Sequence, residues 1–343
     1  MSVEEPDAIA PRRGKVTRRV ILLVVALVVL YLFLPTLGEV FSAWPELAHL
    51  DPVWMLVAVG SETLSFVCVW WLLKQALRAT GWFAVATSQL AGNALSCVMP
   101  GGAAPGAALQ YRMLGASGID APAAASALTA ATLLQLATLA AIPVLGLVVS
   151  FFGRPLAHDL KEAAWIGLGA FVVLVGIGTV LVLSDRVVGD IGAVVQWARN
   201  RIVRHATPVR DLPDRLRAER DQVSQALGER WPSAVLASVG KWTFDYFALL
   251  ACLAAVGARP EPTLLLLAYA ASVVLGMIPI TPGGLGFVEA GLTAALALAG
   301  VGAGDAVLAT LSYRLVSFWL PLPAGLGGYA AYRLRQRSEL KEA

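Results

Sequence analysis

The sequence is poor in charged residues, cysteines and histidines, and these shortages exclude several classes of protein. Charged residues make up 14% of its 343 residues, against roughly 25% in an ordinary soluble domain. The 3 cysteines stand apart in apolar stretches without a CxxC pair, so a disulfide scaffold or thiolate metal site is not expected. The 3 histidines are far apart as well, and P-loop, GxGxxG, HExxH and GxSxG motifs are absent. We therefore expect no metal ion, no cofactor and no catalytic residues.

Apolar residues are abundant instead. They form 58% of the chain, and the mean hydropathy is +0.72. A soluble globule cannot bury that much apolar surface, so the composition predicts an all-α polytopic membrane protein with about eight transmembrane helices. The apolar segments are 20–37, 52–77, 82–99, 105–114, 121–151, 163–183, 233–257, 262–279, 284–300 and 306–331.

The basic residues predict the orientation of the chain in the membrane. Of the 26 Lys and Arg residues, 20 lie in two tails (1–19 and 332–343), in the 185–230 loop and at the end of the 52–77 segment. Because cytoplasmic flanks are rich in Lys and Arg, these parts are expected in the cytoplasm. The sequence thus predicts a multi-pass plasma-membrane domain, 20–331, between two basic cytoplasmic tails.

The 185–230 loop is charged but carries leucine and valine at helical spacing. It is expected to form an amphipathic helix on the inner membrane surface, or to dock a cytoplasmic or membrane enzyme. Its 9 basic and 7 acidic residues leave too little net charge to predict nucleic-acid binding.

Two similar glycine-proline breaks interrupt the apolar segments. The predicted cytoplasmic location of the basic segments requires that 82–115 enters the membrane from the cytoplasm, breaks and returns to the same side. The 262–300 segment is either a matching re-entrant hairpin or two full spans. Three spans separate the breaks, which predicts two halves in an inverted repeat with a binding site near the midplane. The alternative is that both breaks are ordinary loops. The break residues are Pro100, Gly101, Gly102, Gly106, Pro279, Pro282, Gly283, Gly284 and Gly286.

Three ionisable residues in apolar segments are expected to be structural. Lys241 and Asp245 are four residues apart on one helical face, which favours an ion pair between them. Glu62 would pair with Lys241 if the 52–77 and 233–257 segments meet.

Three further charges lie close to the breaks. Arg112, Glu289 and Arg314 are candidates for binding a phosphate-bearing headgroup or for coupling, because arginine binds phosphate through two parallel hydrogen bonds. The alternative is that Glu289 and Arg314 neutralise each other and hold the helices together.

The break motifs resemble those of a known family. The stretches MPGG (99–102), PITPGGLGFVE (279–289) and YR…FWLPLP (313–323) are similar to the lysylphosphatidylglycerol synthase transmembrane-region family, also called the flippase-like domain family. The resemblance covers about 20–331 and adds Asn93 and Tyr313 to the candidate headgroup or coupling residues. The chain departs from the family pattern at Ala107 and Ala108, where an acidic residue is common after the glycine.

The resemblance implies a function in lipid movement. Bifunctional family members join this region to a soluble aminoacyl-transferase domain, for which the short segment after the last span leaves no room, so we expect no synthase activity. The leading hypothesis is a flippase-like protein that translocates a phospholipid or a polyprenyl-linked lipid through a polar groove between inverted halves. The alternative from another class is a membrane scaffold for lipid or cell-envelope enzymes. An intramembrane enzyme is disfavoured, because no nucleophilic triad or metal-ligand cluster lies in the spans.

Overall fold

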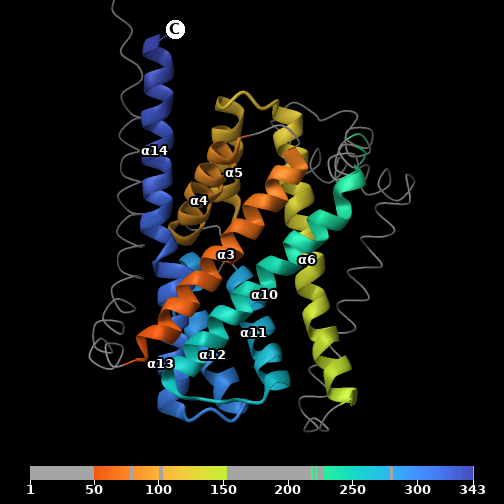
Figure 1. Ribbon diagram of the computed structural model, residues 1–343, viewed down its shortest axis with the longest axis vertical. Helices are drawn as coiled ribbons and strands as arrows, with labels where there is room; N and C mark the ends of the chain where they lie inside the picture. Colours follow the sequence, from red (N-terminus) through yellow and green to blue (C-terminus); the bar gives the residue numbers. More distant parts are fainter. Residues whose placement is uncertain are drawn as a thin grey trace, which may run out of the picture.

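The computed structural model describes residues 50–77, 81–99, 103–152, 228–278 and 281–342, together with positions 218 and 221. Every regular element in these ranges is a helix (Figure 1). The expected 20–37 and 163–183 spans and nearly all of the 185–230 loop lie outside the described residues. The α-helices are α3 (Pro52–Leu77), α4 (Trp82–Val98), α5 (Ala103–Ala116), α6 (Ala121–Phe152), α10 (Trp231–Val256), α11 (Pro262–Met277), α12 (Phe287–Leu298), α13 (Ala303–Arg314) and α14 (Pro321–Glu342).

Four helical stretches are long and apolar enough to cross a membrane: Pro52–Leu77, Ala121–Ile142, Trp231–Val256 and Ala303–Ser338. A helix of 26 residues, such as α3 or α10, spans about 39 Å, which exceeds the roughly 30 Å of a bilayer core. These helices confirm the predicted all-α polytopic membrane protein.

The helices on either side of each break are shorter and pack in pairs. α4 and α5 have 17 and 14 residues, and α11 and α12 have 16 and 12. Such helices are about 18–26 Å long, less than a bilayer core. Each pair is in contact, and Figure 1 shows α4–α5 in the upper half of the molecule and α11–α12 in the lower half. Their short lengths suit hairpins that enter and return, and re-entry into a membrane stays a prediction.

The first half comprises α3 to α6, and the second half comprises α10, α11, α12 and the last span, α13–α14. Corresponding helices of the two halves make corresponding contacts. α3 of the first half lies against α10, its counterpart in the second half (Figure 1). α4 packs on α14, and its counterpart α11 packs on α6. In the same way, the α5–α6 contact corresponds to the α12–α13 contact, and the α3–α6 contact corresponds to the α10–α13 contact. This pattern is expected of two related halves and supports the internal repeat, whose inverted orientation in the membrane stays a prediction.

The first hairpin depends on a close approach between two glycines. A Cβ atom placed on Gly106 of α5 would collide with the carbonyl oxygen of Gly92 and the hydroxyl of Ser96 on α4. Only glycine permits this backbone contact. Gly106 therefore joins the two arms of the hairpin.

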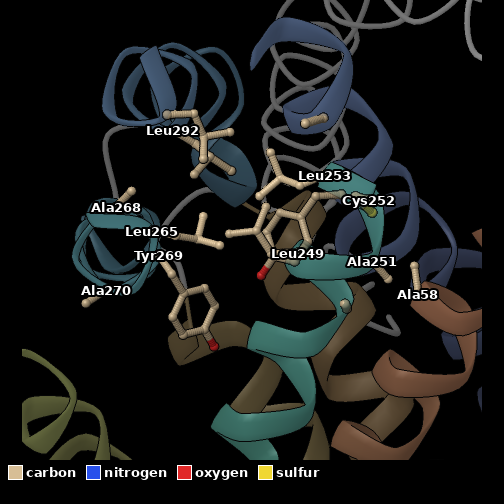
Figure 2. Close-up of a cluster of buried hydrophobic side chains, with 14 of the residues drawn as sticks. Ala58, Leu249, Ala251, Cys252, Leu253, Leu265, Ala268, Tyr269, Ala270 and Leu292 are labelled. Atoms are coloured by element: carbon tan, nitrogen blue, oxygen red, sulfur yellow. The ribbon is translucent and has the colours of Figure 1, made fainter. Parts of the chain in front are cut away.

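The centre of α10 lies in the main hydrophobic core. Figure 2 shows Leu249 and Leu253 of α10 near Leu265 of α11 and Leu292 of α12, and all four side chains are fully buried. Ala58 of α3 packs in the same cluster. Asp245, one turn before Leu249, is buried as well.

The last span is interrupted directly after Arg314. A π-helical turn, η3 (Leu315–Trp319), joins α13 to α14, and the amide of Leu320 donates to the carbonyl of Leu315 over 2.9 Å. Pro321 and Pro323 have no amide hydrogen to continue a regular helix here. The segment 332–343, predicted as a basic tail, extends α14 as far as Glu342. Its cytoplasmic location stays a prediction.

Candidate functional site

The end of α4, just before the first break, lies against the second break. The second break contains the short turn η2 (Pro282–Gly284), in which Gly283 has a φ of 59°. A Cβ on Gly283 would lie 2.9 Å from the carbonyl oxygen of Cys97, near the end of α4, and would collide with the ring of Phe318. The end of the first hairpin arm therefore touches the second break. Pro100, Gly101, Gly102 and Pro279 lie outside the described residues.

A buried ion pair lies at this junction. Nε of Arg314 donates to Oε1 of Glu289 over 2.6 Å, and Nη2 donates to the carbonyl oxygen of Gly283 over 2.9 Å. The guanidinium also lies 4.3 Å from the ring centre of Phe318. Relative exposure is only 10% for the Arg314 side chain and 8% for that of Glu289. Arginine thus links α13, α12 and the second break.

The environment of Glu289 leaves part of its carboxylate available. Glu289 is in the first turn of α12, where the amino end of the helix favours a negative charge. Its second oxygen, Oε2, is buried and has no hydrogen-bond partner among the described residues. The structure confirms that Glu289 and Arg314 pair with each other. Contact with a headgroup stays a prediction for both.

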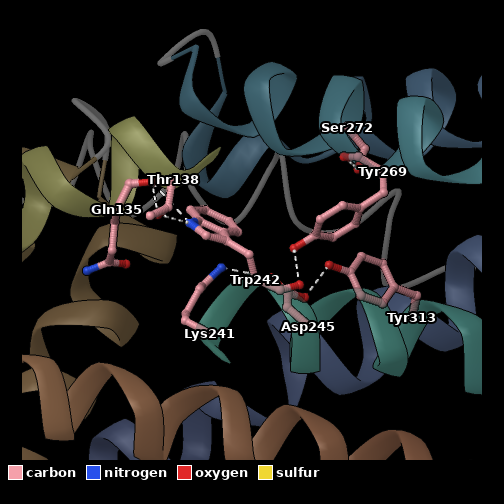
Figure 3. Close-up of polar contacts among 8 residues, drawn as sticks. All are labelled: Gln135, Thr138, Lys241, Trp242, Asp245, Tyr269, Ser272 and Tyr313. Carbon is pink, nitrogen blue, oxygen red and sulfur yellow. Dashed lines mark hydrogen bonds and ion pairs between the residues drawn. The ribbon is translucent and has the colours of Figure 1, made fainter. Parts of the chain in front are cut away.

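A second polar cluster surrounds Asp245 (Figure 3). Nζ of Lys241 donates to Oδ2 of Asp245 over 2.8 Å, which confirms the predicted ion pair. The hydroxyl of Tyr313 donates to Oδ1 over 2.6 Å. Tyr313, a candidate headgroup residue, is therefore buried against Asp245. Because Arg314 follows it directly, α13 holds both polar sites in position.

Glu62 belongs to the second cluster as well. The sequence predicted that Glu62 would pair with Lys241 if their two segments met. The two helices, α3 and α10, do pack against each other. Glu62 is 7% exposed and interacts electrostatically with both Lys241 and Asp245, although the ion pair of Lys241 is with Asp245. The three residues predicted to be structural are thus brought together.

Sequence reasoning missed the contribution of α11. Tyr269 is fully buried, and its hydroxyl lies 3.4 Å from the carbonyl oxygen of Trp242 and beside the Asp245 carboxylate. Tyr269 is the one tyrosine in α11, in a stretch of aliphatic and small residues. A phenol in such a helix is a usable signal, because a buried tyrosine hydroxyl normally needs a partner.

A set of hydrogen bonds fixes α6 against α10 beside this cluster. The indole nitrogen of Trp242 donates to the carbonyl oxygen of Gln135 over 3.0 Å and to the hydroxyl of Thr138 over 3.1 Å (Figure 3). Thr138 and Ser238 hydroxyls are 2.6 Å apart. These bonds hold the α10 backbone that carries Lys241 and Asp245.

Two further candidate residues lie elsewhere. Arg112 is exposed on α5, whereas Arg314 and Glu289 are buried, so the structure does not bring Arg112 into the ion pair. Asn93 is half-buried on α4. Roles for both residues in binding a headgroup stay predictions. Within the described ranges, no group of three potential metal-ligating side chains occurs.

Fold and site together define a polytopic α-helical membrane protein with buried charged side chains among its helices. The family model described as Lysylphosphatidylglycerol synthase TM region matches residues 19–325. The chain belongs to this family.

One relative shares a shorter stretch. A UPF0104 membrane protein of Methanothermobacter thermautotrophicus is 35% identical over 89 residues. The match covers 26% of this chain and 25% of the relative, so the chain spans about a quarter of that protein's length.

Proposed function

We propose that the protein moves a phosphate-bearing lipid, either a phospholipid or a polyprenyl-linked lipid, between the leaflets of the plasma membrane. The headgroup would pass between the two halves while the tails stay in lipid. The observation that carries this proposal is the buried Arg314–Glu289 pair beside the second break, where the end of α4 lies against that break. The basic segments would lie in the cytoplasm, with both termini on that side.

The cost of burial supports a role beyond holding helices together. Each charge in the centre of a membrane costs roughly 2.5–3.5 kcal/mol on insertion scales, and such charges usually mark a substrate path. An apolar pair of similar volume is often as stable as a buried ion pair. A purely structural contact therefore does not require Arg314 and Glu289.

The geometry suggests how a headgroup would be received. Arg314 uses Nε and Nη2 on protein oxygens, and a phosphate that replaces Glu289 would meet the same fork of N–H donors. Glu289 would then turn toward an amine of the headgroup or toward water, as its free Oε2 already permits. No nucleotide-binding motif is present in the sequence, so a gradient or passive exchange would drive the movement.

Lipid exchange in liposomes tests the proposal. Purified protein is reconstituted with fluorescent lipid analogues of anionic and zwitterionic headgroups, and an impermeant quencher reports exposure at the outer leaflet. Exchange faster than in protein-free liposomes is expected, and Arg314→Gln should abolish it. Arg337→Gln is the matched control, because Arg337 is exposed near the end of α14.

Two results would contradict the proposal. One is the absence of exchange for every lipid tested, including a polyprenyl-linked analogue, with protein shown to be folded. The other is unchanged exchange in folded Arg314→Gln protein. The first result would favour the alternative of a membrane scaffold, and the second would show that the headgroup does not bind at Arg314.

A further inference from the structure

Polar side chains from α10, α11 and α13 lie around Glu62 of α3, in a cluster that Tyr313 places next to the Arg314–Glu289 pair. Glu62 extends from α3, Asp245 and Lys241 from α10, Tyr269 from α11 and Tyr313 from α13. Lys241, Tyr269 and Tyr313 surround the carboxylate of Asp245 in Figure 3. Neither the family resemblance nor the Lys241–Asp245 pair explains why Glu62 and Tyr269 are present.

The two carboxyl groups differ in their partners. Asp245 accepts hydrogen bonds from Lys241 and Tyr313, which is the surrounding of an ionised carboxylate. Glu62 is more than nine-tenths buried, and its Oε2 has no hydrogen-bond partner in the described part of the chain. Glu62 is therefore the carboxyl group without a charged donor of its own.

The charges of the cluster do not balance when both carboxyls are ionised. Lys241 supplies one positive charge against two negative charges, and Glu62 and Asp245 lie close enough to interact directly. Two carboxylates that share a buried site normally hold one proton between them. One proton on Glu62 makes the cluster neutral.

The other titratable groups nearby do not supply the missing positive charge. Cys252 of α10 lies near Glu62 and carries no positive charge. Arg314 is already paired with Glu289, and Cys97 of α4 lies beside Arg314. The described side chains of α6, which packs on α3, include no titratable group.

A cavity reaches the edge of the cluster. It has a volume of about 160 Å³ and lies between α6, α10 and α11, with Thr138, Trp242, Tyr246 and Tyr269 in its lining. Tyr269 forms part of the cavity wall, and its hydroxyl lies beside Asp245. A tyrosine hydroxyl both accepts and donates hydrogen bonds, so Tyr269 stands between the cavity and the carboxylate of Asp245.

We propose that Glu62 and Asp245 form a proton-binding site, in which Glu62 takes up and releases the proton while Asp245 stays paired with Lys241. On uptake, a proton from water bonds to a Glu62 carboxylate oxygen and the cluster changes from one net negative charge to neutral. On release, the same bond breaks and the proton returns to water. As a second step, which rests on the proposed lipid translocation, this site couples lipid movement to a proton gradient.

Proton binding is tested without any transport. Infrared difference spectra of the reconstituted protein, recorded while the pH is stepped, report the stretching band of a protonated carboxyl group. A titrating band is expected in the wild-type protein and should be lost in Glu62→Gln. Glu261→Gln is the matched control, because Glu261 is exposed just before α11. Thermal unfolding and circular dichroism establish that each variant is folded.

The outcomes separate the two steps. A band that is absent, or that remains unchanged in folded Glu62→Gln protein, overturns the proton-binding site. For coupling, an imposed pH gradient should change the rate of lipid exchange in the wild-type protein, and Glu62→Gln should remove that dependence completely. If the infrared band is present but the rate of lipid exchange does not depend on the pH gradient, coupling alone is overturned. If no exchange occurs at all, the proposed function fails, and the infrared result still decides whether Glu62 binds a proton.

Discussion

The Arg314–Glu289 pair makes a quantitative prediction about stability. Removing one partner of a buried pair leaves an uncompensated charge, which costs about 3–5 kcal/mol. Arg314→Met also deprives the Gly283 carbonyl of its donor, so we expect this variant to be less stable than Glu289→Met. The double variant Arg314→Met/Glu289→Met leaves no buried charge behind and lacks only the donor to the Gly283 carbonyl. We therefore expect it to be more stable than either single variant and to lie within about 1–3 kcal/mol of the wild-type protein.

Thermal unfolding in detergent with added lipid measures these differences. At about 2 °C per kcal/mol, each single variant should lower Tm by roughly 6–10 °C, whereas the double variant should recover all of this loss except the part that belongs to the Gly283 hydrogen bond. Arg337→Met controls for the loss of an exposed arginine. The reasoning is refuted if the losses of the two single variants add up in the double variant, because the two side chains would then act independently.

Two further predictions concern the cluster around Asp245 and the first hairpin. Tyr313→Phe removes the 2.6 Å hydrogen bond to Asp245 and should destabilise the protein by about 1.5–3 kcal/mol; denaturation should show no comparable loss for Tyr329→Phe at a more exposed position. Gly106→Val should separate α5 from α4, since a Cβ there meets the α4 backbone, and limited proteolysis should cut this hairpin faster. Gly115→Val on the same helix has open space around it, and equal sensitivity of the two variants would contradict this explanation.

Helix positions and local pairs could be predicted from the sequence. The apolar segment 52–77 coincides with α3, and 121–151 lies within one residue of α6. The spacing of four residues between Lys241 and Asp245 predicted their ion pair, because helical geometry alone brings such residues together. The glycine-proline breaks predicted where α4 and α11 end.

Contacts between helices could not be predicted in the same way. Apolar residues are spread around both α3 and α10, so apart from the charges Glu62, Lys241 and Asp245 their sequences do not indicate which face is turned inward. The contact between Tyr313 and Asp245, 68 residues apart, depends on that rotation. The rotation of α5 likewise leaves Arg112 exposed rather than beside Arg314.

Transport by the double variant Arg314→Met/Glu289→Met tests the central claim most directly. A structural pair and a headgroup site make different predictions once the fold of this variant has been verified by its Tm. Our account predicts that lipid exchange in liposomes falls to the protein-free rate, because no charge remains to receive the phosphate. Exchange at the wild-type rate in this folded variant would contradict the account and would reduce the pair to a contact between helices.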